Sequence, residues 1–499
     1  MELQFNKTVI PCQQTLLRRM QTQEQTQEVR LTDDMPDIGK VLGSWGQILV
    51  RGKEWHSGTA AMSGGVMVWT LYEPEDGSQP QSVATWLPFQ MKWDFTDTDR
   101  DGTLRVLPML RSVDGRSVSA RKLMVRAGIG MLGEVMAPAE AEVFVPGEMP
   151  EDIQLLKNTY PIQMPKESGE KAFTLEETLS LPASAPELGK LIRFTLQPEL
   201  VDQKVMADKV VMRGVAILSI LYTGTDGQLY NWDFELPFSQ YAQLDKEYDT
   251  DATAQIWLAV TALELEPGEE GNLNLKAGLT GQYVICERPV VEVVEDAYSP
   301  VRSVIPQISP LQLPAVLDDR TETVHAEQTA QMDGVRVVDT VFYPDYAQQH
   351  TDGEKIVSDL TGVFQMLGTD GNGQLMSTTS RWDSDWTLNA DSDTNVEMTV
   401  QPTGRPKATL SAGNVDMRAD MLLNARTTAQ QGIPMVTGLT LGEMSEPDAN
   451  RPSLILRRAG TDRLWDLAKR TGSTVEAIRK ANDLQQEPDS DQMLLIPVN

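Results

Sequence analysis

Apolar residues along 1–450 follow the patterns of β-strands, and helical periodicity is weak there. The clearest case is Gly214–Tyr222, an apolar and β-branched run typical of a buried strand. An Asp-Gly turn follows at Asp226-Gly227, and Leu229–Phe234 then alternates in part as the returning strand. A second antiparallel pair is predicted at Ile256–Leu265 and Leu273–Ile285, separated by Glu266-Pro267-Gly268.

The pattern changes in residues 452–499, where two segments have helical spacing. Leu464–Arg470 predicts one helix that ends at Gly472, and the apolar residues from Val475 to Ala481 predict a second. Ser453–Arg457 before them and Met493–Pro497 after them read as short strands. The predicted order is strand, helix, helix, strand, which is a small α+β (βααβ) unit.

The front of the chain contains an internal repeat with an offset of 150 residues. Several matched segments share this register, including Pro36–Leu42 with Pro186–Ile192 and Leu71-Tyr72 with Leu221-Tyr222. Gly64 and Gly214 match in the same way, and the Leu-Pro-Phe segments at 87–89 and 236–238 match with a slip of one residue. A diverged third copy is predicted at 310–445, where a strand and a Gly-rich turn recur.

This repeat predicts a mainly β protein of tandem antiparallel β-sandwich-like modules, followed by the α+β unit. The predicted domains are residues 1–150, 151–300, 310–445 and 452–499. Linkers rich in Pro, Ser or acidic residues are expected at Ala137–Pro150, Ser299–Pro314 and Gly442–Pro452.

The chain is strongly acidic, with 43 basic and 72 acidic residues and a formal net charge of −29. This charge argues against nucleic acid and anionic membranes as partners, because both require a basic surface. The C-terminal unit nevertheless carries a cluster of basic residues, which we call the basic cluster: Arg457, Arg458, Arg463, Lys469, Arg470, Arg479 and Lys480. Two interpretations remain open: a solvated surface, or a docking face for an acidic partner or for the acidic front of another copy.

Residue usage predicts a soluble intracellular protein without a membrane span. Cys12 and Cys286 are far apart, which does not resemble a disulfide framework and fits a reducing compartment. The first residues lack the apolar core of a signal peptide. The longest apolar run, Gly214–Tyr222, has nine residues, well below the ~20 needed to span a bilayer.

Candidate catalytic groups are scarce, so a non-enzymatic protein without cofactors or metals is expected. The three histidines, His56, His325 and His350, share no motif that could form a metal or general-base site. A phosphate-binding Gly-rich loop is not present. Asp97–Gly102 imitates the start of a calcium loop, but its twelfth position would be Pro108, which favours a solvated hairpin turn.

The C-terminal unit resembles a LysM domain, a module that binds N-acetylglucosamine polymers and sometimes proteins. The matching residues are Gly460, Asp462, Leu464-Trp465, Leu467-Ala468, Ile478, Asn482, Leu484 and Leu495-Ile496-Pro497. Where the family usually has Gly-Asp-Thr-Leu, this chain has one inserted residue, in Gly460-Thr461-Asp462-Arg463-Leu464. The resemblance implies that ligand or partner contacts come from two loops, with Gly460, Thr461, Asp462 and Arg463 in one and Asn482, Asp483 and Leu484 in the other. Trp465 is interpreted as a core residue, since it shares a helical stripe with Leu464 and Ala468.

The repeated modules resemble SPOCS domains, through the Pro-Asp-Ile-Gly-Lys-Val-Leu head, the Gly-x6-Leu-Tyr strand and the Leu-Pro-Phe turn. Tandem modules ending in a LysM domain are similar to the SipL group of spore coat morphogenetic proteins of spore-forming Firmicutes, which parallels SpoVID. The resemblance implies a mother-cell, cytoplasmic scaffold at the forespore surface, within the spore coat.

The same resemblance implies partners. Its LysM domain would bind the coat's morphogenetic ATPase, and the other modules would support assembly with further coat proteins. The alternative is a protein that binds peptidoglycan or a related N-acetylglucosamine polymer. Association with another copy as a homo-oligomer is also left open.

Overall fold

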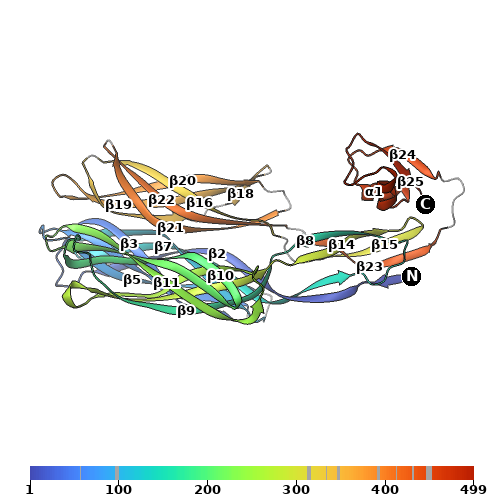
Figure 1. Ribbon diagram of the computed structural model, residues 1–499. Helices are drawn as coiled ribbons and strands as arrows, with labels where there is room; N and C mark the ends of the chain where they lie inside the picture. The colour runs from blue at the N-terminus through green and yellow to red at the C-terminus, as the bar shows by residue number, and fades with distance from the viewer. Residues whose placement is uncertain are drawn as a thin grey trace.

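The computed structural model describes residues 1–56, 58–95, 100–311, 316–332, 334–345, 349–353, 355–389, 394–411, 413–429, 432–445 and 452–498. Strands dominate, they pair in many small antiparallel sheets, and two short helices occur in the C-terminal part. The prediction of a mainly β protein is therefore confirmed. Figure 1 shows a bundle of β bodies, a narrower stalk that leads away from them, and a helical unit beside that stalk.

The first body consists of two three-stranded sheets that enclose one apolar core. One sheet has the order β3 (Ile38–His56), β4 (Thr59–Pro74), β5 (Gln81–Asp94), and the other has the order β2 (Asn6–Arg30), β7 (Lys122–Val145), β6 (Thr103–Ser119). Residues from both sheets fill the space between them, such as Val66, Leu87, Leu123 and Ile129, each at most 1% exposed. Burying these side chains is the main stabilisation of the body.

The second body contains β9 (Met164–Leu179), β10 (Leu188–Gly224), β11 (Leu229–Tyr248), β12 (Thr253–Pro267) and β13 (Leu273–Glu287), with a short 3-10 turn at Glu269–Gly271. The predicted hairpin is confirmed, because Tyr222 in β10 lies opposite Tyr230 in β11. The second predicted pair is also confirmed, since β12 and β13 pair with Leu265 opposite Leu275.

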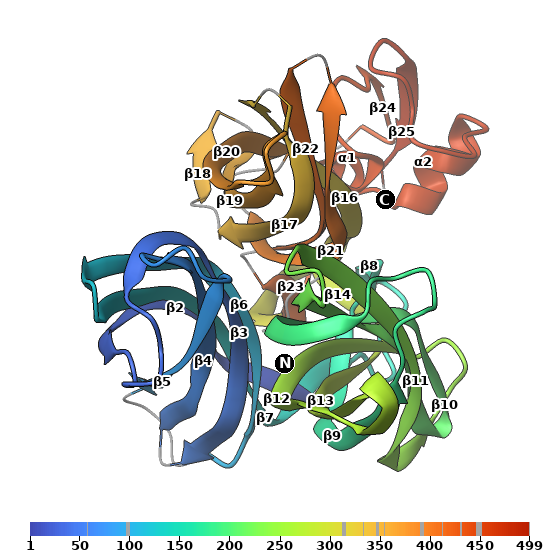
Figure 2. The same ribbon diagram turned by 90° about the vertical axis from the view of Figure 1, so that its left-hand side faces the viewer.

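The third body contains β16 (Val316–Gln331), β17 (Arg336–Asp345), β18 (Gln349–Asp352), β19 (Lys355–Thr369), β20 (Leu375–Asn389), β21 (Thr394–Ser411) and β22 (Asn414–Ala429). They form one sheet of β16, β22 and β21, and another in which β17, β18 and β20 all pair with β19. Viewed along the stalk, the three bodies surround a common axis, with the blue first body, the green second body and the orange third body at its corners (Figure 2).

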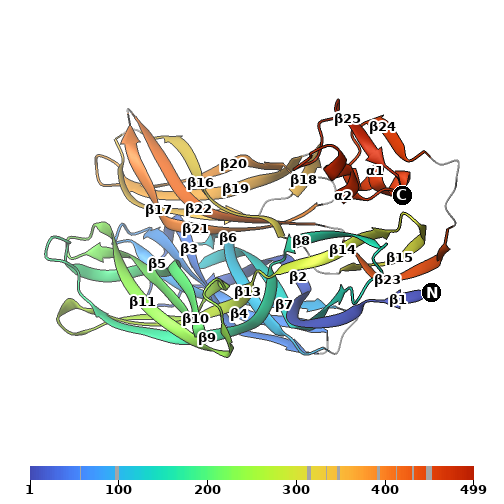
Figure 3. The same ribbon diagram turned by 45° about the vertical axis from the view of Figure 1, so that its right-hand side comes forward.

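The stalk is made of antiparallel ribbons that extend from the bodies. Its strands are β8 (Gln154–Pro161) with β14 (Val290–Tyr298), β15 (Arg302–Leu311) with β23 (Ile433–Met444), β1 (Glu2–Gln4) on the other edge of β23, and the outer ends of β2 and β7. All three ribbons contribute to one apolar cluster, for example through Cys12, Val293 and Met435. Figure 3 shows these ribbons running together toward the N-terminus.

The prediction of two of the linkers is wrong, because most of each segment forms a strand of the stalk. Ala137–Val145 belongs to β7 and pairs with β2, and most of Ser299–Pro314 forms β15. Proline and acidic content suggested a linker, but Ala141 and Val143 alternate with exposed glutamates and face the stalk interior, which is a strand pattern. Of the third predicted linker, Gly442–Pro452, the residues up to Met444 lie in β23, and residues 446–451 lie outside the described part.

Two hydrogen bonds occur at equivalent places in the first and second bodies. The Tyr72 hydroxyl donates to the Pro36 carbonyl over 3.0 Å, and the Tyr222 hydroxyl donates to the Pro186 carbonyl over 3.1 Å. Both partners are 150 residues apart between the two bodies. The repeated proline and tyrosine motifs are therefore explained by one contact that recurs in both bodies, between the segment just before β3 or β10 and the buried strand that carries the tyrosine.

The C-terminal unit consists of β24 (Leu454–Arg458), α1 (Leu464–Thr471), α2 (Val475–Ala481) and β25 (Met493–Pro497), in the predicted order. β24 and β25 pair antiparallel. Gly472 ends α1 with a left-handed backbone, φ 66°, and the Thr474 side chain caps α2 by accepting from the Ala477 amide. Its interior is apolar, with Leu464, Leu467, Ile478, Leu494 and Ile496 fully buried.

Candidate functional site

The two loops of the C-terminal unit that the sequence suggests as binding loops lie on its surface. Gly460, Thr461, Arg463 and Asp483 are exposed, while the remaining three, Asp462, Asn482 and Leu484, are half-buried. Exposure alone makes these residues available, so their hydrogen-bonding partners decide whether they can bind a ligand.

Polar side chains of the first loop are engaged within the unit itself. Asp462 forms ion pairs with Arg457 at 3.2 Å and with Arg470 at 2.5 Å. Arg463 pairs with Asp466, one helical turn further on, at 3.1 Å. These contacts hold the loop against α1, and they leave few polar groups of this loop directed toward a sugar.

Asn482 in the second loop has a structural role that sequence reasoning did not identify. Its amide nitrogen donates to the carbonyls of Ile478 and Leu495 over 2.8 and 2.7 Å, and its oxygen accepts from the Leu495 amide over 2.8 Å. The side chain thereby ties the end of α2 to the outer edge of β25. Asp483 follows with a positive φ of 52°, which asparagine and aspartate tolerate better than most residues.

The first loop is hydrogen-bonded to the segment from Glu487 to Gln492, which follows the second loop, and not to residues 482–484. The amides of Ala459 and Gly460 donate to the carbonyls of Gln492 and Ser490, each over 2.9 Å. The Leu464 amide, at the start of α1, donates to the Glu487 carboxylate over 2.9 Å. A carboxylate at this position satisfies a free amide of the first helical turn.

Trp465 is buried, as predicted, but it is buried partly against the stalk. Its exposed fraction is 7%, its indole nitrogen donates to Asp296 of β14 over 2.8 Å, and its ring meets Tyr298 edge-on with centroids 4.8 Å apart. Lys469 also pairs with Asp296, at 2.7 Å. The Tyr298 hydroxyl donates to the Ser473 carbonyl over 3.0 Å. Asp296 and Tyr298 thus form a cradle for α1 that only the folded arrangement reveals.

Replacing Asp296 by alanine is expected to loosen this contact. The carboxylate accepts hydrogen bonds from Trp465 and Lys469, and hydrogen bonds to charged groups contribute about 1.5–3 kcal/mol each. We expect amide hydrogen exchange in α1 and at Ser473 to become about tenfold faster or more. The control is Asp466→Ala, which removes an acid from α1 that pairs with Arg463. Equal exchange in both variants would contradict the role given to Asp296.

Most of the basic cluster is paired with acids of the same chain. Six of its seven members lie within 4.0 Å of a carboxylate; the acids are Asp462, Asp491, Asp466, Asp296 and Glu487. Exposed pairs of this kind contribute little. Lys469 pairs with Asp296 of its own chain rather than with an acid of another copy. Fewer residues of the basic cluster are therefore available to bind an acidic partner.

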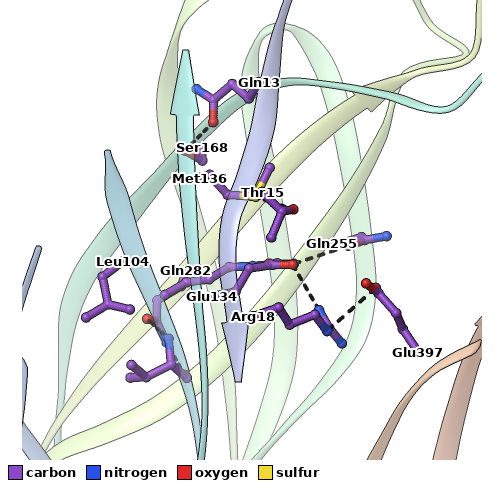
Figure 4. Close-up of polar contacts among 12 residues, drawn as sticks. Gln13, Thr15, Arg18, Leu104, Glu134, Met136, Ser168, Gln255, Gln282 and Glu397 are labelled. Atoms are coloured by element: carbon purple, nitrogen blue, oxygen red, sulfur yellow. Dashed lines mark hydrogen bonds and ion pairs between the residues drawn. The ribbon is translucent and has the colours of Figure 1, made fainter. Parts of the chain in front are cut away.

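A buried charged cluster joins the three bodies. Arg18 of the first body lies 2.9 Å from Glu134 of the same body and 3.6 Å from Glu397 of the third body (Figure 4). Glu134 also pairs with Arg105, whose guanidinium stacks 4.0 Å above the ring of Trp257 in the second body. Burial alone would raise the pKa of Glu134, but Arg105 and Arg18 outweigh burial and hold this pKa below its ordinary value.

Glutamine side chains complete backbone hydrogen bonding between bodies. Gln282 of the second body donates to the Val106 carbonyl over 2.7 Å and accepts from the Val106 amide over 2.8 Å. Gln47 of the first body accepts from the Leu196 amide over 2.8 Å. Buried backbone groups need such partners, so these contacts fix the bodies relative to one another.

A pocket between the second and third bodies has balanced charge. Arg193, 1% exposed, pairs with Asp339 at 2.9 Å, and Arg405 pairs with both Asp339 and Asp233. Burial, with Arg193 nearby, lowers the pKa of Arg405 to about 10. The charged residues that line the pocket are two arginines, Arg193 and Arg405, and two aspartates, Asp339 and Asp420, so its lining carries no net charge.

The histidines lie apart, and their neighbours form no recognised catalytic arrangement. His325 lies 2.7 Å from Asp420, and His350 lies 3.7 Å from Asp359. In the described ranges, no group of three or more His, Cys, Asp or Glu residues is placed to hold a metal ion. Asp97–Asp99 of the calcium-like segment lie outside the described residues.

Comparison with known proteins identifies one segment. Residues 187–266 match the family described as SipL, SPOCS domain. They cover β10, β11 and nearly all of β12, which is the buried hairpin region of the second body. A domain of this family implies a spore coat assembly protein, located in the spore coat, with coat proteins as partners. No curated protein and no solved structure matches the chain.

Among the described residues, no helix combines the length and the apolar character needed to cross a membrane.

Proposed function

We propose that the chain is a non-enzymatic scaffold of spore coat assembly that acts in the mother-cell cytoplasm at the forespore surface. The match of residues 187–266 to the SPOCS domain carries this proposal. The three bodies support it, because buried contacts join them into one platform, and a platform of this kind suits a protein that positions others.

The domain division proposed is three SPOCS-like modules at 1–150, 151–300 and 310–445, followed by a LysM domain at 452–499. Tyr72 donates a hydrogen bond to the Pro36 carbonyl in the first module, and Tyr222 donates one to the Pro186 carbonyl in the second. These equivalent hydrogen bonds support the equivalence of the first two modules. The strand, helix, helix, strand order and the antiparallel pair of β24 and β25 support the LysM assignment.

The C-terminal unit is proposed to dock the coat morphogenetic ATPase. Protein is favoured over N-acetylglucosamine polymer as its ligand because Asp462, Arg463 and Asn482 already bind groups of the same unit. A glycan site needs polar side chains that are free to bond sugar hydroxyls, since binding depends on satisfied polar contacts.

A binding experiment with the full chain tests this choice. The immobilised chain is exposed separately to the purified coat ATPase and to purified cortex peptidoglycan. We expect saturable binding of the ATPase and no retention above background on peptidoglycan. Retention of the chain by peptidoglycan, without binding of the ATPase, would overturn the proposal in favour of a wall-binding protein.

Localisation gives an independent check. A fluorescent fusion of the full chain is expected to form a ring around the forespore during sporulation, because a coat scaffold must accumulate at that surface. Deletion of the coat ATPase is expected to disperse the ring. A diffuse signal in cells that contain the ATPase would contradict the proposed location.

A further inference from the structure

The three bodies that surround a common axis (Figure 2) share one apolar cluster. Each body contributes a buried leucine from a strand that leads into a turn: Leu71 of β4, Leu221 of β10 and Leu367 of β19. These three leucines are at most 1% exposed. The cluster holds the bodies together, because it removes apolar surface of all three from water.

The three leucines occupy equivalent positions in their bodies. Leu71 and Leu221 are related by the 150-residue repeat. Leu221 and Leu367 each stand three residues before a residue that begins a turn of the same form, Gly224 in one body and Asp370 in the other. The amide of each of these residues donates to the carbonyl four residues further on, over 2.8 and 2.9 Å. The bodies therefore meet through the same part of one shared fold.

One position beside these leucines carries a different type of residue in each body. Gly43 of β3 lies opposite Leu71, Asp339 of β17 lies opposite Leu367, and a register shift directly precedes both. The repeat relates Gly43 to Arg193 of β10. Gly43, Arg193 and Asp339 are thus one position in three bodies, and we call these three residues the axial layer.

The two charged residues of the axial layer are buried against each other. Arg193 is 1% exposed and Asp339 is 3% exposed, and Nη1 of Arg193 in the second body lies 2.9 Å from Oδ2 of Asp339 in the third. The Arg193 guanidinium also lies 5.2 Å from the ring centre of Trp45 in the first body. This ring needs the glycine, since a Cβ at Gly43 would lie 2.9 Å from it. The layer therefore combines one cation, one anion and one position without a side chain.

Any other combination of bodies would bring like residues together in this layer. Three second bodies would place three guanidinium groups there, and three third bodies would place three carboxylates. Burial of like charges beside one another is strongly unfavourable, and repulsion of wrong partners is a common source of specificity. The leucines cannot make this distinction, because every body supplies the same one.

We propose that the axial layer determines the order in which the three bodies assemble: it accepts one first, one second and one third body, and it rejects arrangements in which two second or two third bodies meet. Arg193 and Asp339 are the specificity-determining residues of this assembly. The platform is then an internal trimer of repeated modules, and the second bodies of separate copies cannot form such a trimer among themselves. The inference goes beyond the proposed function, because it holds whatever the platform binds.

Two backbone amides report separately on the contacts between bodies. The Gly404 amide of the third body donates to the Glu199 carboxylate of the second body over 2.7 Å. The Leu196 amide of the second body donates to the Gln47 side chain of the first body over 2.8 Å. Hydrogen exchange measured at single residues in the full-length chain therefore distinguishes release of the third body from loosening of all three.

Single substitutions reproduce the layers of the wrong arrangements. Asp339→Arg gives the third body the residue of the second, and Arg193→Asp gives the second body the residue of the third. We expect exchange at Gly404 to become about tenfold faster or more in both variants, and exchange at Leu196 to stay within about threefold of the wild type in Asp339→Arg. The control is Arg381→Asp, which reverses an exposed charge on β20 of the third body and is expected to leave both amides unchanged.

A pair of leucine variants gives a second test, which also decides the question if Asp339→Arg does not fold. Asp339→Leu leaves the guanidinium of Arg193 buried beside no carboxylate of the layer, so exchange at Gly404 is expected to become faster. Adding Arg193→Leu removes that charge, and replacement of both members of a buried ion pair by apolar residues is often neutral. The double variant is therefore expected to return to within about threefold of the wild type.

Faster exchange at Gly404 in the two charged variants, an unchanged control and recovery in the double leucine variant together support the axial layer. Wild-type exchange in Asp339→Arg and Arg193→Asp overturns it. A double leucine variant that exchanges as fast as Asp339→Leu overturns it as well, since the defect then does not come from an unpaired charge. Equal acceleration at Gly404 in Arg381→Asp has the same meaning. The proposed function stands or falls separately, on the binding of coat proteins.

Discussion

Replacing Glu134 by alanine is expected to lower the free energy of unfolding by about 3–5 kcal/mol, the usual effect of removing one partner of a buried ion pair. Glu134 is 4% exposed and lies between Arg105 and Arg18. Its loss leaves Arg105, also 4% exposed, as a buried charge without its carboxylate. Urea unfolding followed by tryptophan fluorescence measures the change.

The control for this variant lies on the same strand. Glu142 of β7 pairs with Lys7 at 2.5 Å, but both side chains are about half exposed. Exposed pairs contribute about 0–1 kcal/mol, so Glu142→Ala is expected to leave the urea midpoint almost unchanged. Equal effects of the two substitutions would show that the buried cluster does not join the bodies.

The pKa of Glu134 also predicts how the stability of the fold changes with pH. Burial opposes ionisation of Glu134, but Arg105 and Arg18 outweigh it and hold the pKa of Glu134 in the folded chain below its ordinary value. A group with a depressed folded-state pKa binds fewer protons when folded, so it stabilises the fold above its unfolded-state pKa. This stabilisation is lost as the pH falls from about 4.5, the pKa of the glutamate in the unfolded chain, through its lower pKa in the folded chain. Glu134→Gln is expected to flatten stability in that range.

Replacing Gly214 by alanine is expected to destabilise the second body by about 3 kcal/mol or more, at or above the upper end for overpacking. A Cβ at this position would lie 2.1 Å from the Glu199 carbonyl oxygen and 2.5 Å from the Phe238 ring. Backbone atoms at this distance cannot yield as a flexible side chain does. Gly64→Ala is expected to behave alike, since its Cβ would lie 2.1 Å from the Leu49 carbonyl.

Gly371→Ala is the control for the glycine variants. An added Cβ at Gly371 meets no atom within 4 Å, so the melting temperature is expected to shift little. Differential scanning calorimetry of the three variants measures the effect. A Gly214→Ala chain that melts with the wild type would contradict the close approach of the Phe238 ring and the Glu199 backbone.

Local sequence patterns predicted the hairpins and the helices because these depend on neighbouring residues. The Asp226-Gly227 turn fixed the register of β10 and β11, and Gly472 fixed the end of α1. The repeat pointed to residues such as Gly64 and Gly214, and the structure shows why they recur: a phenylalanine ring packs on each of them.

Long-range contacts could not be predicted in the same way. Arg18 meets Glu397 across 379 positions of sequence, and Asp296 meets Trp465 across 169, so no local pattern records either contact. Proline and acidic residues after Ala137 predicted a linker, although Ala141 and Val143 alternate with exposed residues there as in a strand. The resemblance to a LysM domain makes Asn482 a candidate binding residue, and its side chain forms a bridge between α2 and β25.

The pairing of β1 with β23 has a consequence for how the protein is made. Glu2–Gln4 pairs with Gly438–Thr440. β1 therefore cannot pair until the ribosome has synthesised β23, more than four hundred residues later. At about 5–20 residues per second this delay is roughly 20–90 s. The nascent chain can complete each body in turn during synthesis, but the stalk can close only after β23 has been synthesised.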